Sequence, residues 1–336
     1  MIVELGGERV RLAGSAELTG EAAELAEASA PSNTLKAYAG HLRRLDAFCK
    51  TNGLDPWQPV SVADYLAACH TAQHHAADTL AQAASAIRAA YRATGRPDRQ
   101  EAWRQVIKGA RNAIATRGAT TREAPPVRLD ALRDATRALY AELHEGPRLQ
   151  APRAARDRAL LLIGFLSGLR KTELVVLDMD DVTTSKDGMT LRVRGTKNHR
   201  STVFQVTIGR GRIGRATCPV AAWEDWTQQR PAFLPTLSAP AWLSTGRSGR
   251  LTACRIGAGH SIERILHRAL RLARVEDPTR YTAHSLRAGL ATELSESGVT
   301  LAQVANAGRW DSVDTVLRYA RRARRWQDSP LRSLDY

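Results

Sequence analysis

Apolar residues recur at helical spacing along most of the chain. Between Ser32 and Gly53 one face of the expected helix carries Leu35, Tyr38, Leu42, Leu45 and Phe48. Ala-rich stretches reaching Arg92 and running from Glu101 to Thr116 continue the pattern. The apolar run at 159–169, ALLLIGFLSGL, is too short to span a bilayer. It therefore predicts a helix buried in a protein core.

One segment alternates with the period of a β-strand instead. LRVRG at 191–195 and STVFQVTI at 201–208 place apolar and polar side chains in turn. The residues between them, TKNHR, are typical of a turn, so the pair predicts a β-hairpin. The fold class expected is mainly α with a small β-sheet, that is, α+β.

Composition divides the chain. Residues 1–29 are acidic and rich in Ala and Gly, which predicts a loosely held N-terminal arm. Residues 30–117 are expected to form a helical domain. The segment around 118–127 contains threonines, a glycine and a Pro-Pro pair, as linkers do. A larger domain then occupies 128–336.

The formal net charge is +15, and arginine supplies most of the excess. An acidic partner is the natural consequence, and a nucleic-acid backbone is the commonest one. The alternative is a soluble protein that simply carries many arginines. Candidate DNA contacts lie on the polar faces of the first domain's helices: Lys36, Arg43, Arg44, Arg88, Lys108 and Arg111.

Cysteine and histidine spacing argues against a metal centre. The four cysteines are scattered without a CxxC pair, which speaks against a zinc ribbon and a disulfide framework. His70 and His74 have helical spacing but no HExxH carboxylate, so a solvated helix face is the better interpretation. The first residues lack the features of a signal peptide. We expect a cytoplasmic, nucleoid-associated protein with no membrane contact, metal or cofactor.

Four short segments carry residues suited to chemistry on phosphate. They are SGLRKTELVVLDMDDV, the hairpin turn, HSLRAGLATELSESG and AGRWDSVDTVLRYARR. The residues of interest in them are Arg170, Glu173, Lys197, His284, Arg287, Trp310 and Tyr319. Each taken alone is compatible with an ordinary structural role, such as a surface arginine or a solvated i, i+3 pair.

Taken together, the segments resemble the tyrosine recombinase, or phage integrase, family. The family pattern is Arg, a Lys in a β-turn, H-x-x-R, then His or Trp, with Tyr nine residues later. Trp310 and the RGTKNH turn look most like the Cre branch. The resemblance implies a C-shaped clamp on duplex DNA with a SAM-like core-binding domain. It also implies a homotetramer on inverted-repeat sites and a 3′-phosphotyrosyl intermediate formed without metal or ATP.

The residue types fit that chemistry. Guanidinium groups of Arg170 and Arg287 can bind the charged non-bridging oxygens. His284 can take the proton of the Tyr319 hydroxyl, whose ordinary pKa is about 10. Lys197 can protonate the departing 5′-oxygen. Trp310 can donate its indole N–H to a phosphate oxygen. Glu173, one helical turn beyond Arg170, can orient a catalytic side chain.

Two features depart from the family pattern. Trp310 stands where most members have histidine, which removes an acid–base group but keeps a donor. The junction Gly308-Arg309-Trp310 is one residue longer than usual, so we expect the loop before Trp310 to bulge. Tyr281 and Tyr336 are rival tyrosines without the family spacing.

Other functions share parts of this pattern. A type IB topoisomerase or a telomere resolvase would use the same chemistry on one site. A catalytically silent DNA-binding regulator could keep the scaffold alone. The sequence leaves open the target DNA, the direction of reaction, the type of mobile element, the role of the arm and the participation of accessory proteins.

Overall fold

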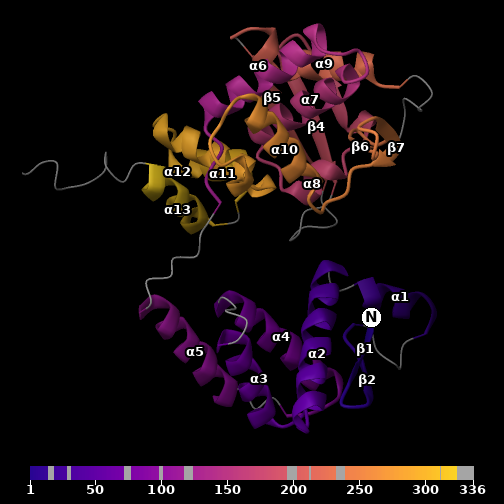
Figure 1. The fold of residues 1–336 in the computed structure, drawn as a ribbon, viewed down its shortest axis with the longest axis vertical. Coiled ribbons are helices and arrows are strands. Elements are labelled where there is room, and N and C mark those ends of the chain that lie inside the picture. Colours follow the sequence, from indigo (N-terminus) through magenta and orange to yellow (C-terminus); the bar gives the residue numbers. More distant parts are fainter. Residues whose placement is uncertain are drawn as a thin grey trace, which may run out of the picture. The chain divides into compact units, whose positions relative to one another are not determined.

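The computed structural model describes residues 1–13, 19–28, 32–71, 77–97, 101–116, 124–194, 203–211, 213–231, 239–310 and 312–323. The chain divides into two compact units, Met1–Arg122 and Glu123–Tyr336 (Figure 1). Both are built largely from helices with small antiparallel sheets, as the sequence predicts. No helix in the ranges given above is long and apolar enough to cross a membrane.

The first unit is a helical domain with one core. Its elements are β1 (Ile2–Leu5), β2 (Glu8–Arg11), α1 (Gly20–Ala28), α2 (Ser32–Asn52), α3 (Pro59–Thr71), α4 (Ala77–Ala93) and α5 (Glu101–Thr116). Helix α2 buries the predicted apolar face, including Leu42 and Leu45, against α4. Trp103 of α5 packs edge-on against Tyr91 with ring centroids 5.7 Å apart. Buried residues of α2 to α5 thus form one hydrophobic core.

The expectation of a loosely held arm is wrong for residues 1–13. Strands β1 and β2 form an antiparallel hairpin that pairs Val3 with Val10, and β1 packs on α2. Val3, Leu5 and Val10 are buried in the first unit's core. Four-residue strands are too short for the alternation to stand out in an acidic, Gly-containing segment, and burial of these side chains provides the stabilisation.

The second unit surrounds a buried central helix. Its helices are α6 (Leu129–Glu145), α7 (Ala151–Ser167), α8 (Lys171–Val175), α9 (Pro219–Gln229), α10 (Ser261–Leu272), α11 (Ala283–Glu296), α12 (Leu301–Gly308) and α13 (Val313–Ala323). Its strands are β3 (Val182–Thr184), β4 (Gly188–Arg194), β5 (Val203–Gly209), β6 (Leu243–Thr245) and β7 (Leu251–Arg255). Helix α7 contains the predicted apolar run, which is buried from Ala159 to Phe165.

The predicted hairpin is present as β4 and β5, with β3 added at the edge to give the order β3-β4-β5. The strand register pairs Arg194 with Val203 at the end of the hairpin next to the connecting segment. The pair β6–β7 was not predicted, since its short strands mix polar and apolar residues without clear alternation. Trp242, the residue before β6, donates its indole N–H to the Leu174 carbonyl at 2.8 Å. This hydrogen bond ties the β6–β7 pair to α8.

The chain enters the second unit across helix α11. The Val127 backbone N–H donates to the Ser285 carbonyl at 2.9 Å, and Arg128 forms an ion pair with Glu293 at 3.1 Å. Gly289 permits this crossing, because a Cβ there would overlap the Val127 carbonyl. The helix that carries His284 and Arg287 is thereby fixed at its outer face.

Several arginines belong to the interior rather than to a DNA-facing surface. Arg158 is fully buried and pairs with Asp225 at 2.7 Å. Arg156 is also buried and bonds to Asp157 and to the Leu243 carbonyl. These pairs satisfy the charges that the core encloses. The number of arginines in the sequence therefore overstates how many are available to a nucleic acid.

Candidate active site

Arg170 is positioned by the turn between α7 and α8. Helix α7 ends at Gly168 in the left-handed conformation, with φ of +57°, and Arg170 caps the short helix α8. Its backbone N–H donates to Oε2 of Glu173 at 2.9 Å, and its Nη1 donates to Oε1 at 3.0 Å. Glu173 is buried, so its carboxylate holds both the backbone and the guanidinium of Arg170. The i, i+3 spacing therefore brings Glu173 into contact with Arg170, and its orienting role stays a prediction.

Arg287 is almost completely buried in α11 beside this turn. Its Nη1 donates to the Gly168 carbonyl, and its Nη2 donates to the Arg309 carbonyl at 3.4 Å. Its guanidinium carbon lies 4.2 Å from the centroid of the Trp310 ring, a cation–π contact. Burial, followed by the charges of Arg170 and Arg309, lowers the pKa of Arg287 to about 10. The group therefore remains a cation at neutral pH.

Tyr319 and His284 meet at the edge of this arginine cluster. The Tyr319 hydroxyl and Nε2 of His284 are 2.7 Å apart, a hydrogen bond between α13 and the first turn of α11. Helix α13 is held there by Val316 and Ala320, which are buried against α11 and α12. The Tyr319 and Trp310 ring centroids are 6.0 Å apart. The tyrosine, the histidine and the tryptophan thus lie within one site.

The segment before Trp310 differs from the expectation. Helix α12 ends at Gly308, Arg309 follows in the left-handed conformation with φ of +53°, and Trp310 N–H donates to the Ala305 carbonyl at 2.9 Å. This is a Schellman turn, not a bulge. A bulge was expected because the segment has one residue more than the family pattern. The additional residue is instead accommodated in the turn that ends α12, where Arg309 is left-handed.

Six of the seven residues singled out in the sequence are therefore brought together. Lys197 lies outside the described residues, as do His74 and Tyr336. Tyr281 packs against the main core of the second unit, whereas Tyr319 packs against a separate small cluster, and the Tyr281 carbonyl is hydrogen-bonded to His267 at 2.6 Å. Lys171 points to Glu263, with a 3.7 Å ion pair. Among the described residues, Arg309 also reaches this cluster although the sequence reasoning did not single it out, and its position next to Trp310 was its only signal.

The candidate DNA contacts of the first unit are placed on α2, α4 and α5. Five are exposed: Lys36, Arg43, Arg44, Lys108 and Arg111. Arg88 is half-buried and donates to the Ser85 hydroxyl at 2.8 Å. Within the part of the chain that the structure describes, no cluster of three or more His, Cys, Asp or Glu side chains could hold a metal ion.

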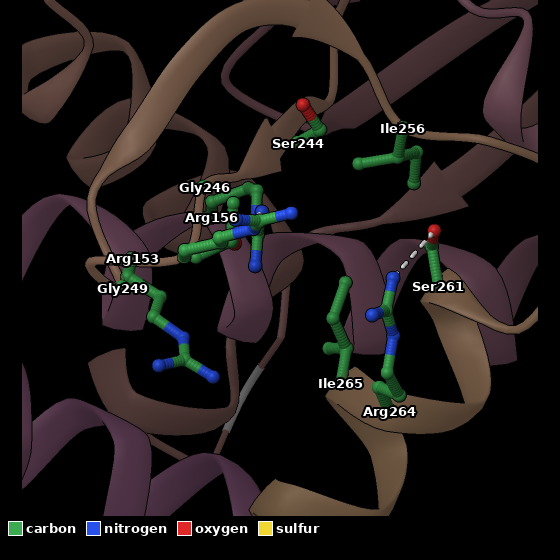
Figure 2. A pocket seen from close by; sticks show the side chains of 11 residues that line it. Arg153, Arg156, Ser244, Gly246, Gly249, Ile256, Ser261, Arg264 and Ile265 are labelled. Atoms are coloured by element: carbon green, nitrogen blue, oxygen red, sulfur yellow. Dashed lines mark hydrogen bonds between the residues drawn. The ribbon is translucent and has the colours of Figure 1, made fainter.

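A second arginine-rich site lies elsewhere in the second unit. A cavity of about 280 Å³ opens between the start of α7, the β6–β7 turn and the start of α10. Figure 2 shows Arg153 on one side and Arg264 on the other, with Arg264 donating to the Ser261 hydroxyl. Arg156 and Arg247 also line it. Burial, followed by the charges of Arg268 and Arg156, lowers the pKa of Arg153, while the carboxylates of Asp157 and Glu142 oppose the shift.

An arginine cluster beside a histidine-bonded tyrosine equips an enzyme that acts on phosphodiesters. The chain matches the family model described as "Phage integrase family" over residues 132–325, and "Phage integrase, N-terminal SAM-like domain" over residues 23–96. The chain belongs to the phage integrase, or tyrosine recombinase, family, and it is a tyrosine site-specific recombinase.

Two curated relatives illustrate the match. The chain is 30% identical to a tyrosine recombinase XerC of Mycobacterium sp. (strain KMS), over 80% of this chain and 81% of the relative. It is 23% identical to an integrase/recombinase xerD homolog of Selenomonas ruminantium, over 96% of this chain and 92% of the relative. These relatives are XerC- and XerD-like, and the closer resemblance to the Cre branch is not confirmed.

Solved recombinase structures share the fold. The XerH recombinase bound to palindromic difH substrate superposes with a TM-score of 0.61 at 16% identity, covering 91% of this chain and 80% of that chain. A lambda integrase dimer bound to a COC′ core site gives a TM-score of 0.50 at 17% identity, covering 93% and 94%.

Proposed function

We propose that this enzyme exchanges strands between two specific duplex sites through a 3′-phosphotyrosyl intermediate on Tyr319. The observation that carries the proposal is the 2.7 Å contact between the Tyr319 hydroxyl and His284, beside the Arg170 and Arg287 guanidinium groups. The partners proposed are duplex DNA with inverted repeats and three further copies of the chain. The clamp geometry of the two units belongs to the same proposal.

The first chemical step uses the groups as they lie. Nε2 of His284 accepts the phenolic proton while the Tyr319 oxygen attacks phosphorus, and the bond from phosphorus to the 5′-oxygen breaks. Arg170 and Arg287 bind the non-bridging oxygens, on which negative charge accumulates. Lys197 gives a proton to the departing 5′-oxygen. A 5′-hydroxyl from the partner duplex then displaces Tyr319, so the phosphodiester energy is conserved and no ATP is consumed.

Trp310 has a clear packing role in this scheme. Its ring supports the face of the Arg287 guanidinium at 4.2 Å and thereby limits the directions in which that group can rotate. Its indole N–H remains the proposed donor to a phosphate oxygen. A tryptophan can supply both the surface and the donor, which accounts for its use where histidine is usual.

The rival functions are separated by the number of DNA sites needed. A recognition site is first selected from randomised duplexes with the Tyr319→Phe protein, which holds DNA without cutting it. Wild-type protein is then supplied with one or two copies on a plasmid. Recombinant product that requires two sites supports the proposal. Relaxation of supercoils with one site, without recombinants, indicates a topoisomerase, and binding without cleavage indicates a regulator.

The arginine-lined cavity of Figure 2 extends the proposed DNA interface. Arg153 has a buried Nε without a hydrogen-bond partner among the described residues, although Asp157 lies 3.8 Å away. An incoming anion of phosphate size would relieve the repulsion between neighbouring guanidinium groups. We assign the cavity to a backbone phosphate of the bound duplex, since such contacts position DNA without reading sequence.

Binding should fall steeply with salt, because a phosphate-binding protein releases condensed counterions. We expect a log–log slope steeper than about −3 for wild type, and Arg264→Ala should make it shallower by about 1. Fluorescence anisotropy across a potassium chloride series measures both. The matched control is Arg271→Ala, an exposed arginine at the far end of α10. An equal slope change in both variants would contradict the phosphate assignment.

Gly308→Ala should damage catalysis through Trp310. A Cβ on Gly308 would overlap ring carbons of Trp310, so the ring must move and the Arg287 guanidinium with it. We expect strand cleavage to slow by about 10²-fold and stability to fall by about 1–3 kcal/mol. Single-turnover cleavage and thermal unfolding measure the two effects. Gly209→Ala, where a Cβ meets no atom within 4 Å, is the control and should cleave normally.

A further inference from the structure

Arg309 adopts a backbone conformation that arginine rarely takes. Its φ of +53° lies in the left-handed region, at the position of a helix end where glycine is usual. A side chain kept there against its own preference is a candidate for function, because local strain persists at sites where the surrounding structure needs the residue. The turn itself accounts for a left-handed residue but does not account for an arginine.

The Arg309 side chain is directed into the site rather than into solvent. Its Nη2 donates to Oε2 of Glu173 at 3.2 Å, and its guanidinium lies 4.3 Å from the centroid of the Phe204 ring on β5. Among the described residues, its Nε and Nη1 are buried and have no hydrogen-bond partner. Burying donors in this way costs free energy, so these contacts do not exist to maximise stability.

Glu173 consequently sits between two guanidinium groups. Its Oε1 accepts from Arg170 and its Oε2 accepts from Arg309 and from the Arg170 backbone. The main-chain carbonyl of Arg309 also accepts from Nη2 of Arg287. The side chain of Arg309 therefore contacts Glu173, which holds Arg170. The backbone carbonyl of Arg309 contacts Arg287 directly.

The described part of this cluster is rich in positive charge. Among the described residues, the guanidinium groups of Arg170, Arg287 and Arg309 lie around the carboxylate of Glu173, so Arg309 adds a third positive charge to the site. Attack of tyrosinate on a phosphodiester monoanion produces a phosphorane with two negative charges. The cluster therefore matches the transition state better than it matches the ground state, which is the requirement for lowering the barrier.

We propose that Arg309 is a positioning residue for strand cleavage, which fixes Glu173 and so Arg170, and adds the positive charge that balances the phosphorane. This inference rests on the proposed function of Tyr319. It assigns Arg309 no direct contact with DNA, since its free donors are buried. Its effect should therefore fall on the rate of the chemical step and not on DNA affinity.

The test compares Arg309→Gly, Arg309→Asn and Arg309→Lys with wild type on a nicked duplex that carries the selected recognition site. Glycine and asparagine both accept the left-handed conformation, so thermal stability should stay equal or rise. Site affinity should be unchanged, and single-turnover adduct formation should slow by about 10–10²-fold in the glycine and asparagine variants. Lysine keeps the charge and should recover part of the rate.

A pH profile separates an electrostatic role from a purely structural one. On DNA with a 5′-bridging phosphorothiolate, where the leaving group needs no proton from Lys197, an alkaline loss of cleavage reports on Arg287. Because burial and the charges of Arg170 and Arg309 lower the pKa of Arg287 to about 10, removal of the Arg309 charge should move that loss to higher pH. Arg309→Lys should leave that limb near its wild-type position. The profile is taken from single-turnover rates at subsaturating protein, which describe the free enzyme.

Wild-type cleavage rates in Arg309→Gly and Arg309→Asn would overturn the inference, as would an unshifted alkaline limb in both. A rate loss accompanied by an equal loss of thermal stability in both variants would reduce Arg309 to a structural residue and would also overturn it. Failure of the proposed function looks different, because wild-type protein itself would then form no adduct that depends on Tyr319.

Discussion

Tyr319→Phe protein is expected to bind its recognition site as tightly as wild type and to form no covalent DNA adduct. The change removes one oxygen atom from a side chain on α13, a helix that the buried residues Val316 and Ala320 hold in place, so the fold should persist. That oxygen is the one 2.7 Å from His284 and next to the arginine cluster. Without it no phosphotyrosyl bond can form, and cleavage should fall below detection.

A nicked duplex traps the adduct, because the short strand released by cleavage diffuses away and cannot be rejoined. Denaturing gels then separate the protein–DNA species from free protein. Reactions are run with EDTA, in which wild-type cleavage should continue, since arginines neutralise the phosphate in this scheme. Tyr281→Phe is the control and should form adduct normally. An adduct that persists in Tyr319→Phe but disappears in Tyr336→Phe would move the nucleophile to the terminal residue.

The long, strongly periodic helices could be predicted because one apolar face specifies each of them. Helix α5 runs from Glu101 to Thr116 as expected, and α2 starts at Ser32. The β4–β5 hairpin was predicted because strand-like alternation on both sides of a polar turn is characteristic of two paired strands. The β1–β2 hairpin was not, since four-residue strands carry too little pattern and only the tertiary contact with α2 defines them.

The site was predictable in its parts but not in its connections. Order and spacing pointed to Arg170, His284, Arg287 and Tyr319, which come from the start of α8 and from helices α11 and α13. Nothing local indicated that Arg287 would stack on Trp310 or bond to the carbonyls of Gly168 and Arg309. Those contacts join segments that are distant in the sequence, and they depend on how α7, α11 and α12 pack.

Arg309 shows why a sequence count can mislead. An additional residue before Trp310 suggested a bulge, whereas the chain closes the helix with a left-handed arginine in a regular turn. The helix end requires a left-handed residue there, and the arginine that occupies it forms an ion pair with Glu173 and a contact with Phe204. These contacts become visible only once the partners are in place.

The contact between Arg309 and Phe204 also bears on Lys197. Phe204 belongs to β5, and the strands β4 and β5 flank the segment that contains Lys197, from Arg194 to Val203. The strand ends next to that segment therefore border the arginine cluster. Lys171, the competing lysine, is engaged with Glu263 and is the matched control. The hairpin thus remains the proposed source of the general acid.

Lys197→Ala should cleave normal DNA about 10²–10⁴-fold more slowly, the usual contribution of one acid–base group. It should recover most of that loss on DNA with a 5′-bridging phosphorothiolate, because a thiolate departs without a proton. Arg170→Ala should not recover, since its guanidinium stabilises charge, and Lys171→Ala should cleave both substrates normally. Single-turnover rates on the two substrates decide the matter. If Lys197→Ala cleaves both substrates equally slowly, or cleaves normal DNA at the wild-type rate, this lysine is structural and another residue is the general acid.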